Sequence, residues 1–377
     1  MLSSDLTVIT GAGFAQGLGG LSVADIDSAF ELLPRRDYNV LESQWQLPHR
    51  RAFDSLLQKL RIRYRESYNF ELLLSALRDM LPFRHHPFIA YTSTLTSVSA
   101  LDGFDAELML DVHEVVINEL LRLVEGRAIP ADGTEFTAAC AYLLSLTDVF
   151  QIVLCDLNYD DFCDSVYREG VADDGFRGNG WPRTFDSGQF VRTRSRVQLM
   201  HLHGSYRFRY NELSGFVKLE HGASRNTPTS ADTTDGSRYQ SLISGTAKAT
   251  QLMALPFVVY YHTFGHSILS RPRLLVIGYG GSDLHLNTLL VQMKQIHGPE
   301  LRVVWVFQGE LGQQNAYMRQ MCAAFTGERY RDPGLAHLES LPFTGDFAQS
   351  GSLLMYNGGF PYARESDSDR IIAHLAS

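Results

Sequence analysis

What this 377-residue sequence lacks excludes several classes of protein. It has four cysteines and none stands in a C-x-x-C pair, so a zinc ribbon, which needs two close pairs, is excluded. No run of about 18 consecutive apolar residues is present, so a membrane-spanning helix is not expected. The first residues lack the basic stretch and apolar core of a secretory signal, which predicts a cytoplasmic protein.

The sequence also lacks an excess of basic residues. Its formal net charge is −9 at pH 7, whereas dedicated nucleic-acid-binding proteins are usually basic, so no direct nucleic-acid binding is expected. Two short basic stretches, 61–65 and 192–196, fit a solvated surface better than a binding patch. The G-x-x-x-x-G-K-[ST] loop is absent, so any ATPase working with this chain would be a separate protein.

What is present predicts an α/β fold. Five short apolar runs have the length and composition of strands buried on both faces of a parallel sheet: Leu6–Thr10, Val149–Cys155, Val197–Leu202, Leu274–Ile277 and Val303–Phe307. Four of them end in polar or glycine-rich turns, at Gly11–Gly20, Asn158–Asp161, His203–Ser205 and Gly278–His285. Because open parallel sheets bind ligands at the carboxyl ends of their strands, these turns are the candidate site.

Between the first two strands the pattern is helical. Ser22 suits the N-cap of a helix from Val23 to Leu33, and apolar residues at helical spacing then recur from about 53 to 146. We therefore expect a Rossmann-like domain formed by residues 1–34 and 149–345, with residues 35–148 as a helical insertion. Residues 346–377 are expected to form a C-terminal tail with a short helix, and Tyr239–Ile268 a helix interrupted at Pro256.

The first glycine loop has two interpretations. Small residues at Gly11, Ala12 and Gly13 allow backbone N–H groups to approach a pyrophosphate, but such glycines also form tight turns. A dehydrogenase would next return to a strand that ends in an acidic residue, about 20 residues after the glycines. That strand is not found, which makes a hydride-transferring enzyme the least favoured function.

The other turns carry polar residues with equally open roles. Asn158 and Asp160 either form an Asx turn or present an amide and a carboxylate to a sugar and a polar ring substituent. His203 is either structural or a general base, since the ordinary pKa of histidine lies near neutral pH. Asp283 suits a helix N-cap, and Ser282 a contact to phosphate or ribose. A metal site at His201 and His203 would need further ligands, so no metal is predicted.

Taken together and in this order, G-A-G-F-A, N-Y-D, H-G and G-Y-G-G-S-D resemble the sirtuin-type NAD-binding domain. The chain is more similar to the zinc-free, sirtuin-like NADases of bacterial antiphage defence than to protein deacylases. The motifs span Gly11 to Asp283, and the strand at Val303–Phe307 completes the sheet. The fold that the resemblance implies is α/β, with a Rossmann-like parallel sheet of sirtuin type, a large helical insertion and no zinc ribbon.

The resemblance also implies a function and a set of residues. The expected reaction is cleavage of the nicotinamide–ribose bond of NAD to nicotinamide and ADP-ribose, with NAD as substrate and no metal. His203 is then the general base, Asn158 orients the ribose or the attacking water, and Asp160 accepts a hydrogen bond from the nicotinamide carboxamide. The remaining NAD-binding residues are expected to be Gly11, Ala12, Gly13, Phe14, Gly278, Gly280, Ser282 and Asp283.

Three departures from the family pattern keep other functions open. Ala15 stands where the family commonly has serine, Gly280 where sirtuins have serine, and "CDL" precedes Asn158 in place of threonine-rich text. A non-catalytic module that binds NAD or ADP-ribose, or a scaffold, is therefore the first alternative; a protein deacylase or ADP-ribosyltransferase is the next. The relatives depend on partners, so a homo-oligomer and a separate defence protein, such as a HerA-type ATPase or an Argonaute, are expected.

Overall fold

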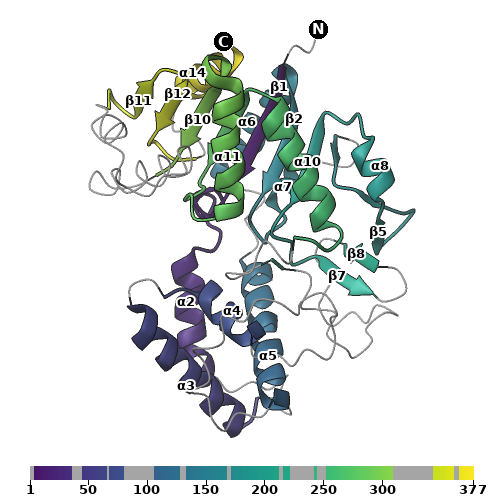
Figure 1. Cartoon of the computed structure of the whole chain (residues 1–377), viewed down its shortest axis with the longest axis vertical. Helices are drawn as coiled ribbons and strands as arrows, with labels where there is room; N and C mark the ends of the chain where they lie inside the picture. The colour runs from purple at the N-terminus through teal and green to yellow at the C-terminus, as the bar shows by residue number, and fades with distance from the viewer. Residues whose placement is uncertain are drawn as a thin grey trace.

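The computed structural model describes residues 4–35, 45–65, 68–79, 106–127, 133–167, 171–211, 215–220, 242–243, 252–308, 343–360 and 365–377. An α/β part lies above a smaller group of helices, and the two parts meet where the strands of the sheet end (Figure 1). The polar segment 222–237, most of the expected helix before Pro256, and Cys322 lie outside the described residues.

The α/β part is organised around a sheet that has eight strands among the described residues. Their order is β11–β12–β10–β9–β1–β2–β6–β3, and all neighbours are parallel except β11 and β12. The strands are β1 (Ser4–Thr10), β2 (Phe150–Asp156), β3 (Ala172–Asp173), β6 (Val197–His201), β9 (Arg273–Ile277), β10 (Arg302–Val306), β11 (Phe347–Ser350) and β12 (Leu353–Tyr356). The five strands expected from sequence are thus confirmed within one or two residues at each end.

The strand order indicates where a ligand is expected to bind. From β1 the chain adds β2 and β6 on one side of the sheet, and later β9, β10 and β12 on the other. The order therefore reverses between β1 and β9, as it does in Rossmann-like sheets. Ligands of such sheets bind beyond the carboxyl ends of the strands at this reversal.

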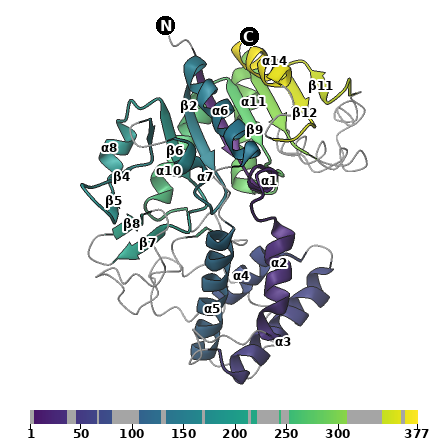
Figure 2. The ribbon, with the colours of Figure 1, turned by 180° about the vertical axis from the view of Figure 1, so that it is seen from behind.

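Helices cover both faces of the sheet. Strand β9 shows why, because Leu274 and Val276 pack toward one face while Leu275 and Ile277 pack toward the other. The first face is covered by α10 (Phe257–Ser270) and α11 (Leu284–His297), and the second by α6 (Thr134–Val149) and α14 (Glu365–Ala376). Figure 2, seen from behind, shows α6 on the side opposite to α11.

The lower part consists of α2 (Val23–Leu32), α3 (Leu47–Tyr64), α4 (Phe70–Asp79) and α5 (Ala106–Gly126), with the 3₁₀ turn η1 (Leu33–Arg35). Their apolar stripes form a third core around Phe30, Phe53 and Leu120. Ser22 begins α2 with a capping box, since its hydroxyl accepts from the Asp25 N–H and the Asp25 carboxylate accepts from the Ser22 N–H. The cap expected from sequence is confirmed.

The domain boundaries differ from the expected ones in three places. Helix α2 belongs to the helical part, because Ile26 and Phe30 pack into its core. Helix α6 belongs to the α/β part, because Leu143 and Leu146 pack on the sheet. The expected C-terminal tail is likewise part of the α/β core, since it supplies β11, β12 and α14. Helical periodicity reveals an apolar face but not which neighbour covers it.

Two further differences are local. The first glycine loop contains the short helix α1 (Ala12–Gly17), so it is more compact than an open loop. A small antiparallel sheet, not expected from sequence, has the order β4 (Phe176–Arg177), β5 (Arg183–Phe185), β8 (Gly215–Lys218) and β7 (Phe208–Asn211). It lies beside α10 and the short helix α8 (Ser187–Val191) (Figure 1).

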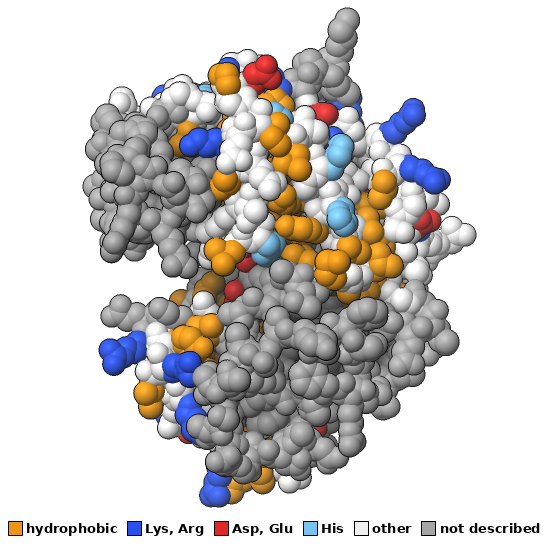
Figure 3. All heavy atoms as spheres, in the orientation of Figure 1, with side chains coloured by type: hydrophobic (Ala, Val, Ile, Leu, Met, Phe, Trp, Pro, Cys, Tyr) orange, Lys and Arg blue, Asp and Glu red, His pale blue; other side chains and the backbone are white. Residues whose placement is uncertain are grey.

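The face that Figure 3 shows carries apolar side chains over and between α10 and α11. The exposed apolar residues on and next to these two helices include Met253, Leu255, Leu284 and Ile296. Among the described residues, no helix combines the length and the apolar character that crossing a membrane requires.

Candidate functional site

A cleft that is open to solvent lies between the two parts of the molecule. Its α/β wall comes from the turns after β1, β2 and β6 and includes Ala12, Ala15, Gly20, Asn158, Asp160 and His203. The helical part supplies the opposite wall, with Val23, Ile26, Phe70, Glu71, Val124 and Arg127. The cleft therefore lies at the carboxyl ends of β1, β2 and β6, next to the reversal between β1 and β9 and not across it.

Asn158 is fixed in the cleft by the buried carboxylate of Asp156, the last residue of β2. One oxygen of Asp156 accepts from the Asn158 backbone N–H at 3.1 Å and from the side-chain Nδ2 at 3.0 Å. The same oxygen accepts from the Thr10 hydroxyl at 2.8 Å, which ties β1 to the arrangement. Because the amide nitrogen is held by Asp156, the Asn158 carbonyl oxygen remains to accept a hydrogen bond from a ligand.

Asp160 lies in the same turn, and the pKa of its carboxyl group is raised. Burial, followed by the neighbouring charge of Asp156, raises its pKa to about 7, although its carboxylate also accepts from the Phe162 N–H at 3.0 Å. The side chain is only partly exposed to solvent and lines the cleft. Near neutral pH, Asp160 can therefore either accept or donate a hydrogen bond to a bound ligand.

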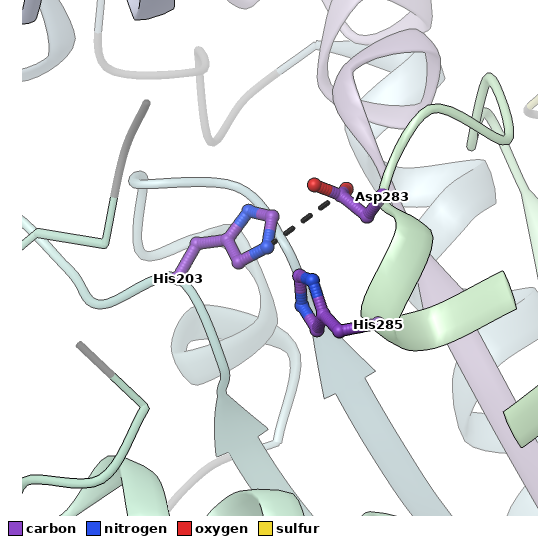
Figure 4. A group of neighbouring side chains, drawn as sticks. All are labelled: His203, Asp283 and His285. Carbon is purple, nitrogen blue, oxygen red and sulfur yellow. Dashed lines mark ion pairs between the residues drawn. The ribbon is translucent and has the colours of Figure 1, made fainter. Parts of the chain in front are cut away.

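His203 follows β6. It faces Asp283 and His285, which come from the second glycine-rich turn, Gly278–His285 (Figure 4). His203 Nε2 lies 3.9 Å from a carboxylate oxygen of Asp283, and the rings of His203 and His285 have centroids 6.2 Å apart. His203 and Asp283 are buried, at 4% and 8% exposure. An imidazole beside a carboxylate can accept a proton, because the carboxylate stabilises the resulting cation.

Asp283 occupies the N-cap position of α11, as the sequence predicts, but its side chain does not cap the helix. The turn is held instead by the Tyr279 hydroxyl, which accepts from the Asp283 N–H at 3.0 Å and donates to Asn287 Oδ1 at 2.9 Å. Asn287 in turn donates to the Gly281 carbonyl at 2.7 Å. The Asp283 carboxylate is thus directed to the histidines.

The glycines of the two loops pack against one another. Gly11 N–H donates to the Ile277 carbonyl at 3.0 Å, and Gly13 N–H donates to the Gly278 carbonyl at 2.9 Å. A Cβ on Gly11 would lie 2.8 Å from the Gly278 oxygen, and one on Gly278 would lie 2.0 Å from the Phe14 nitrogen. These positions require glycine because two backbone segments touch, and the N–H groups of Gly11 and Gly13 are already engaged.

Phe14 is fully buried and packs against Phe162 and Phe360 in the core. Within the part of the chain that the structure describes, no residue from Gly278 to Asp283 lines the cleft. Gly280 and Ser282 therefore do not line the cleft. Asp283 does not line it either, but its carboxylate lies near His203, which does. Of the expected NAD-binding residues, Ala12 and Asp160 line the cleft, together with both expected catalytic residues, Asn158 and His203.

His201 has a different environment from His203. It is completely buried, with Nε2 3.0 Å from Asp164 and Nδ1 3.7 Å from Asp156. Burial alone would lower the pKa of His201, but the charge and hydrogen bond of Asp164, together with the charge of Asp156, raise that pKa. Lys218, 1% exposed, pairs with Asp164 and with Asp174. This buried charge network joins β6, α7 (Phe162–Val166) and β8, so His201 is structural.

Sequence reasoning missed three residues of the site. Asp156 could have been found, because an acidic residue two positions before Asn158 is well placed to bind its backbone. Glu71 and Arg127 could not, because only the fold brings α4 and α5 to these turns. His285, the last residue of the turn Gly278–His285, was given no role.

No protein-family model and no curated protein matches this chain. The cleft therefore has to be interpreted from its own chemistry: an amide, a carboxyl group that titrates near neutral pH, and an imidazole beside a carboxylate.

Proposed function

We propose that this protein is a sirtuin-like NAD hydrolase that cleaves the bond between nicotinamide and ribose. The observation that carries the proposal is the meeting of Asn158, Asp160 and His203 in one cleft at the strand ends. These residues come from two different turns, and both were expected from the motif order. A Rossmann-like sheet order and an opposing helical wall suit an extended dinucleotide.

The proposed reaction breaks the glycosidic carbon–nitrogen bond of NAD. The bonding electron pair passes to the ring nitrogen, so nicotinamide leaves as a neutral molecule and the ribose becomes cationic. Water then attacks the anomeric carbon, and the product is ADP-ribose. Asp160 accepts a hydrogen bond from the nicotinamide carboxamide, while the Asn158 carbonyl oxygen orients a ribose hydroxyl or the attacking water.

His203 accepts the proton that the attacking water loses. The Asp283 carboxylate, 3.9 Å away, stabilises the imidazolium that forms. This gives Asp283 an indirect role in place of the NAD contact expected from sequence. Arg127 is the one lysine or arginine among the described residues that line the cleft, and we assign it to the diphosphate.

The test is to incubate the purified chain with NAD and to quantify nicotinamide and ADP-ribose by chromatography. His203→Ala should lower the rate by about 10²- to 10⁴-fold, and Asn158→Ala should also lower it. His262→Ala is the matched control, because His262 is an exposed histidine on α10. Release that persists in both cleft variants would overturn the site assignment, and absence of release with any partner would overturn the function.

A binding module without turnover is the second candidate. It is favoured by the engaged N–H groups of Gly11 and Gly13, which leave fewer donors for a diphosphate, and by Ala15, a buried cleft residue without a hydroxyl. Tight NAD binding by calorimetry, with no nicotinamide released, would support it. Release that requires an acylated peptide would instead indicate a deacylase.

We further propose that the activity serves antiphage defence by depleting NAD in the cytoplasm. An enzyme that destroys NAD harms its own cell if it is always active, so control by assembly is expected. The proposed partners are further copies of this chain and a separate defence protein, such as a HerA-type ATPase or an Argonaute. Nicotinamide release measured with and without the product of the adjacent gene tests this part.

A further inference from the structure

The cluster of His203, Asp283 and His285 has a second capacity besides proton transfer. We propose that it binds a divalent transition-metal ion, with Zn²⁺ as the best fit, and that the bound ion switches cleavage off by occupying His203. The inhibitory part rests on the proposed function, whereas the metal site itself does not. Sequence reasoning predicted no metal because further ligands near His203 were not apparent, and the fold now supplies two.

The geometry carries the first step of the argument. One ligand atom from each of the three side chains lies within 4.8 Å of the other two, and Figure 4 shows all three side chains converging. Ligand atoms on a tetrahedral zinc ion are about 3.3 Å apart, given bond lengths near 2.0 Å. Small side-chain rotations therefore bring the three ligands to one ion.

The chemistry of the ligands selects the ion. Two imidazole nitrogens and one carboxylate oxygen suit Zn²⁺ and other first-row transition metals, whereas Mg²⁺ and Ca²⁺ prefer oxygen ligands alone. Three protein ligands leave a fourth tetrahedral position for water.

The backbone holds all three residues in place before any ion binds. The His203 carbonyl accepts from the Ile243 N–H at 2.8 Å, the His285 carbonyl accepts from the Tyr261 hydroxyl at 3.3 Å, and the Tyr279 hydroxyl accepts from the Asp283 N–H at 3.0 Å. An aspartate at an N-cap usually binds the first N–H groups of its helix. The Asp283 side chain does not do so, and it faces the histidines.

His203 connects the metal site to the cleft. It is the one member of the cluster that also lines the cleft, within the described part of the chain. A metal ion bound to its imidazole uses the nitrogen lone pair that general-base catalysis needs. Metal binding and water activation at His203 therefore exclude each other.

Binding is tested first and without NAD. The full chain is freed of metal by a chelator, and Zn²⁺ is titrated in by calorimetry; Co²⁺ serves as a spectroscopic probe of coordination. His285→Ala should weaken the affinity at this site by at least about tenfold, while the exposed-histidine control His262→Ala should leave it unchanged. His285→Gln gives a second variant if His285→Ala folds poorly, as thermal unfolding reports.

The inhibitory part is tested by nicotinamide release at increasing Zn²⁺. The wild type should lose activity in step with site occupancy, and His285→Ala should keep its activity at the same Zn²⁺ concentration. Equal affinity in the wild type and both His285 variants would overturn the metal site. If the His285 variants bind Zn²⁺ more weakly than the wild type but Zn²⁺ does not inhibit the wild type, the metal site stands and the switch is overturned. If the chain binds Zn²⁺ but never cleaves NAD, the proposed function is overturned instead.

Discussion

The two glycine-rich turns and the two polar turns lie at the same edge of one sheet but have different roles: the first two pack backbone against backbone, and the other two supply side chains to the cleft. The glycines of the first pair bring backbone segments into contact, with Gly11 and Gly13 against Gly278. The polar turns carry Asn158, Asp160 and His203 into the cleft. A glycine motif after a strand therefore indicates close packing as readily as it indicates a phosphate site, and the side chains at neighbouring strand ends are the better guide to chemistry.

The largest effect is expected from Gly278→Ala. Gly278 has a φ of 67° and would place a Cβ 2.0 Å from the Phe14 nitrogen, so the variant should lose about 4 kcal/mol or more of unfolding free energy. Gly298→Ala is the matched control: Gly298 has a φ of 48° but open space around its Cβ, so the variant should cost only about 1–3 kcal/mol. Urea unfolding of both variants measures the difference. Equal losses would show that the loop contact contributes nothing.

The polar turns should respond in activity, and Asp156→Ala tests this. Removing the carboxylate frees the Asn158 amide, so nicotinamide release should fall by about tenfold or more through kcat. Thr10→Val is the control, because it removes one donor to the same carboxylate oxygen without touching Asn158. A loss explained entirely by unfolding, as seen by circular dichroism, would argue against a positioning role for Asp156.

Asp160 should make stability depend on pH. Its pKa is about 7 in the folded protein but about 3.9 in an unfolded chain, so between these values the folded state binds more protons. The free energy of unfolding should therefore fall as pH rises from about 4 to 7. Asp160→Asn should reduce this fall, whereas Asp148→Asn, at an exposed carboxylate of α6, should not. Urea unfolding across this pH range gives the comparison, and identical slopes in all three proteins would contradict it.

The smallest effect is expected from Ala15→Ser, which restores the hydroxyl found in the family pattern. If the polar turns carry the chemistry, nicotinamide release should change by less than about threefold, or about 0.6 kcal/mol. Chromatography of the two proteins side by side decides the matter. Activity that arises only in the serine variant would support the binding module as the function of the natural chain. It would also show that the first glycine loop is needed for catalysis.

The sequence predicts well where apolar composition is decisive. The runs at Val149–Cys155 and Leu274–Ile277 have the length and composition of buried strands. Because the carboxyl ends of parallel neighbours lie together, Asn158 and His203 were expected to meet. The small second sheet was not predictable, because it encloses the charges of Lys218 and Asp164, residues that composition alone places at the surface. The sequence also did not determine whether α2 and α6 pack in the helical part or on the sheet, because the apolar face of an amphipathic helix does not indicate which element covers it.

The central position of β1 has a consequence for how the chain folds. Thr10 pairs with Asp156, 146 residues further on, and Thr7 bonds Ser267, 260 residues further on. Among the described strands, β1 thus has the neighbours that lie furthest from it in the sequence, β2 and β9. Helices α2 to α5 contact one another over shorter separations and can assemble in the meantime. Until β2 and β9 have been synthesised, the apolar residues Leu6, Val8 and Ile9 lack their strand partners, so this unpaired segment is prone to aggregation in the meantime.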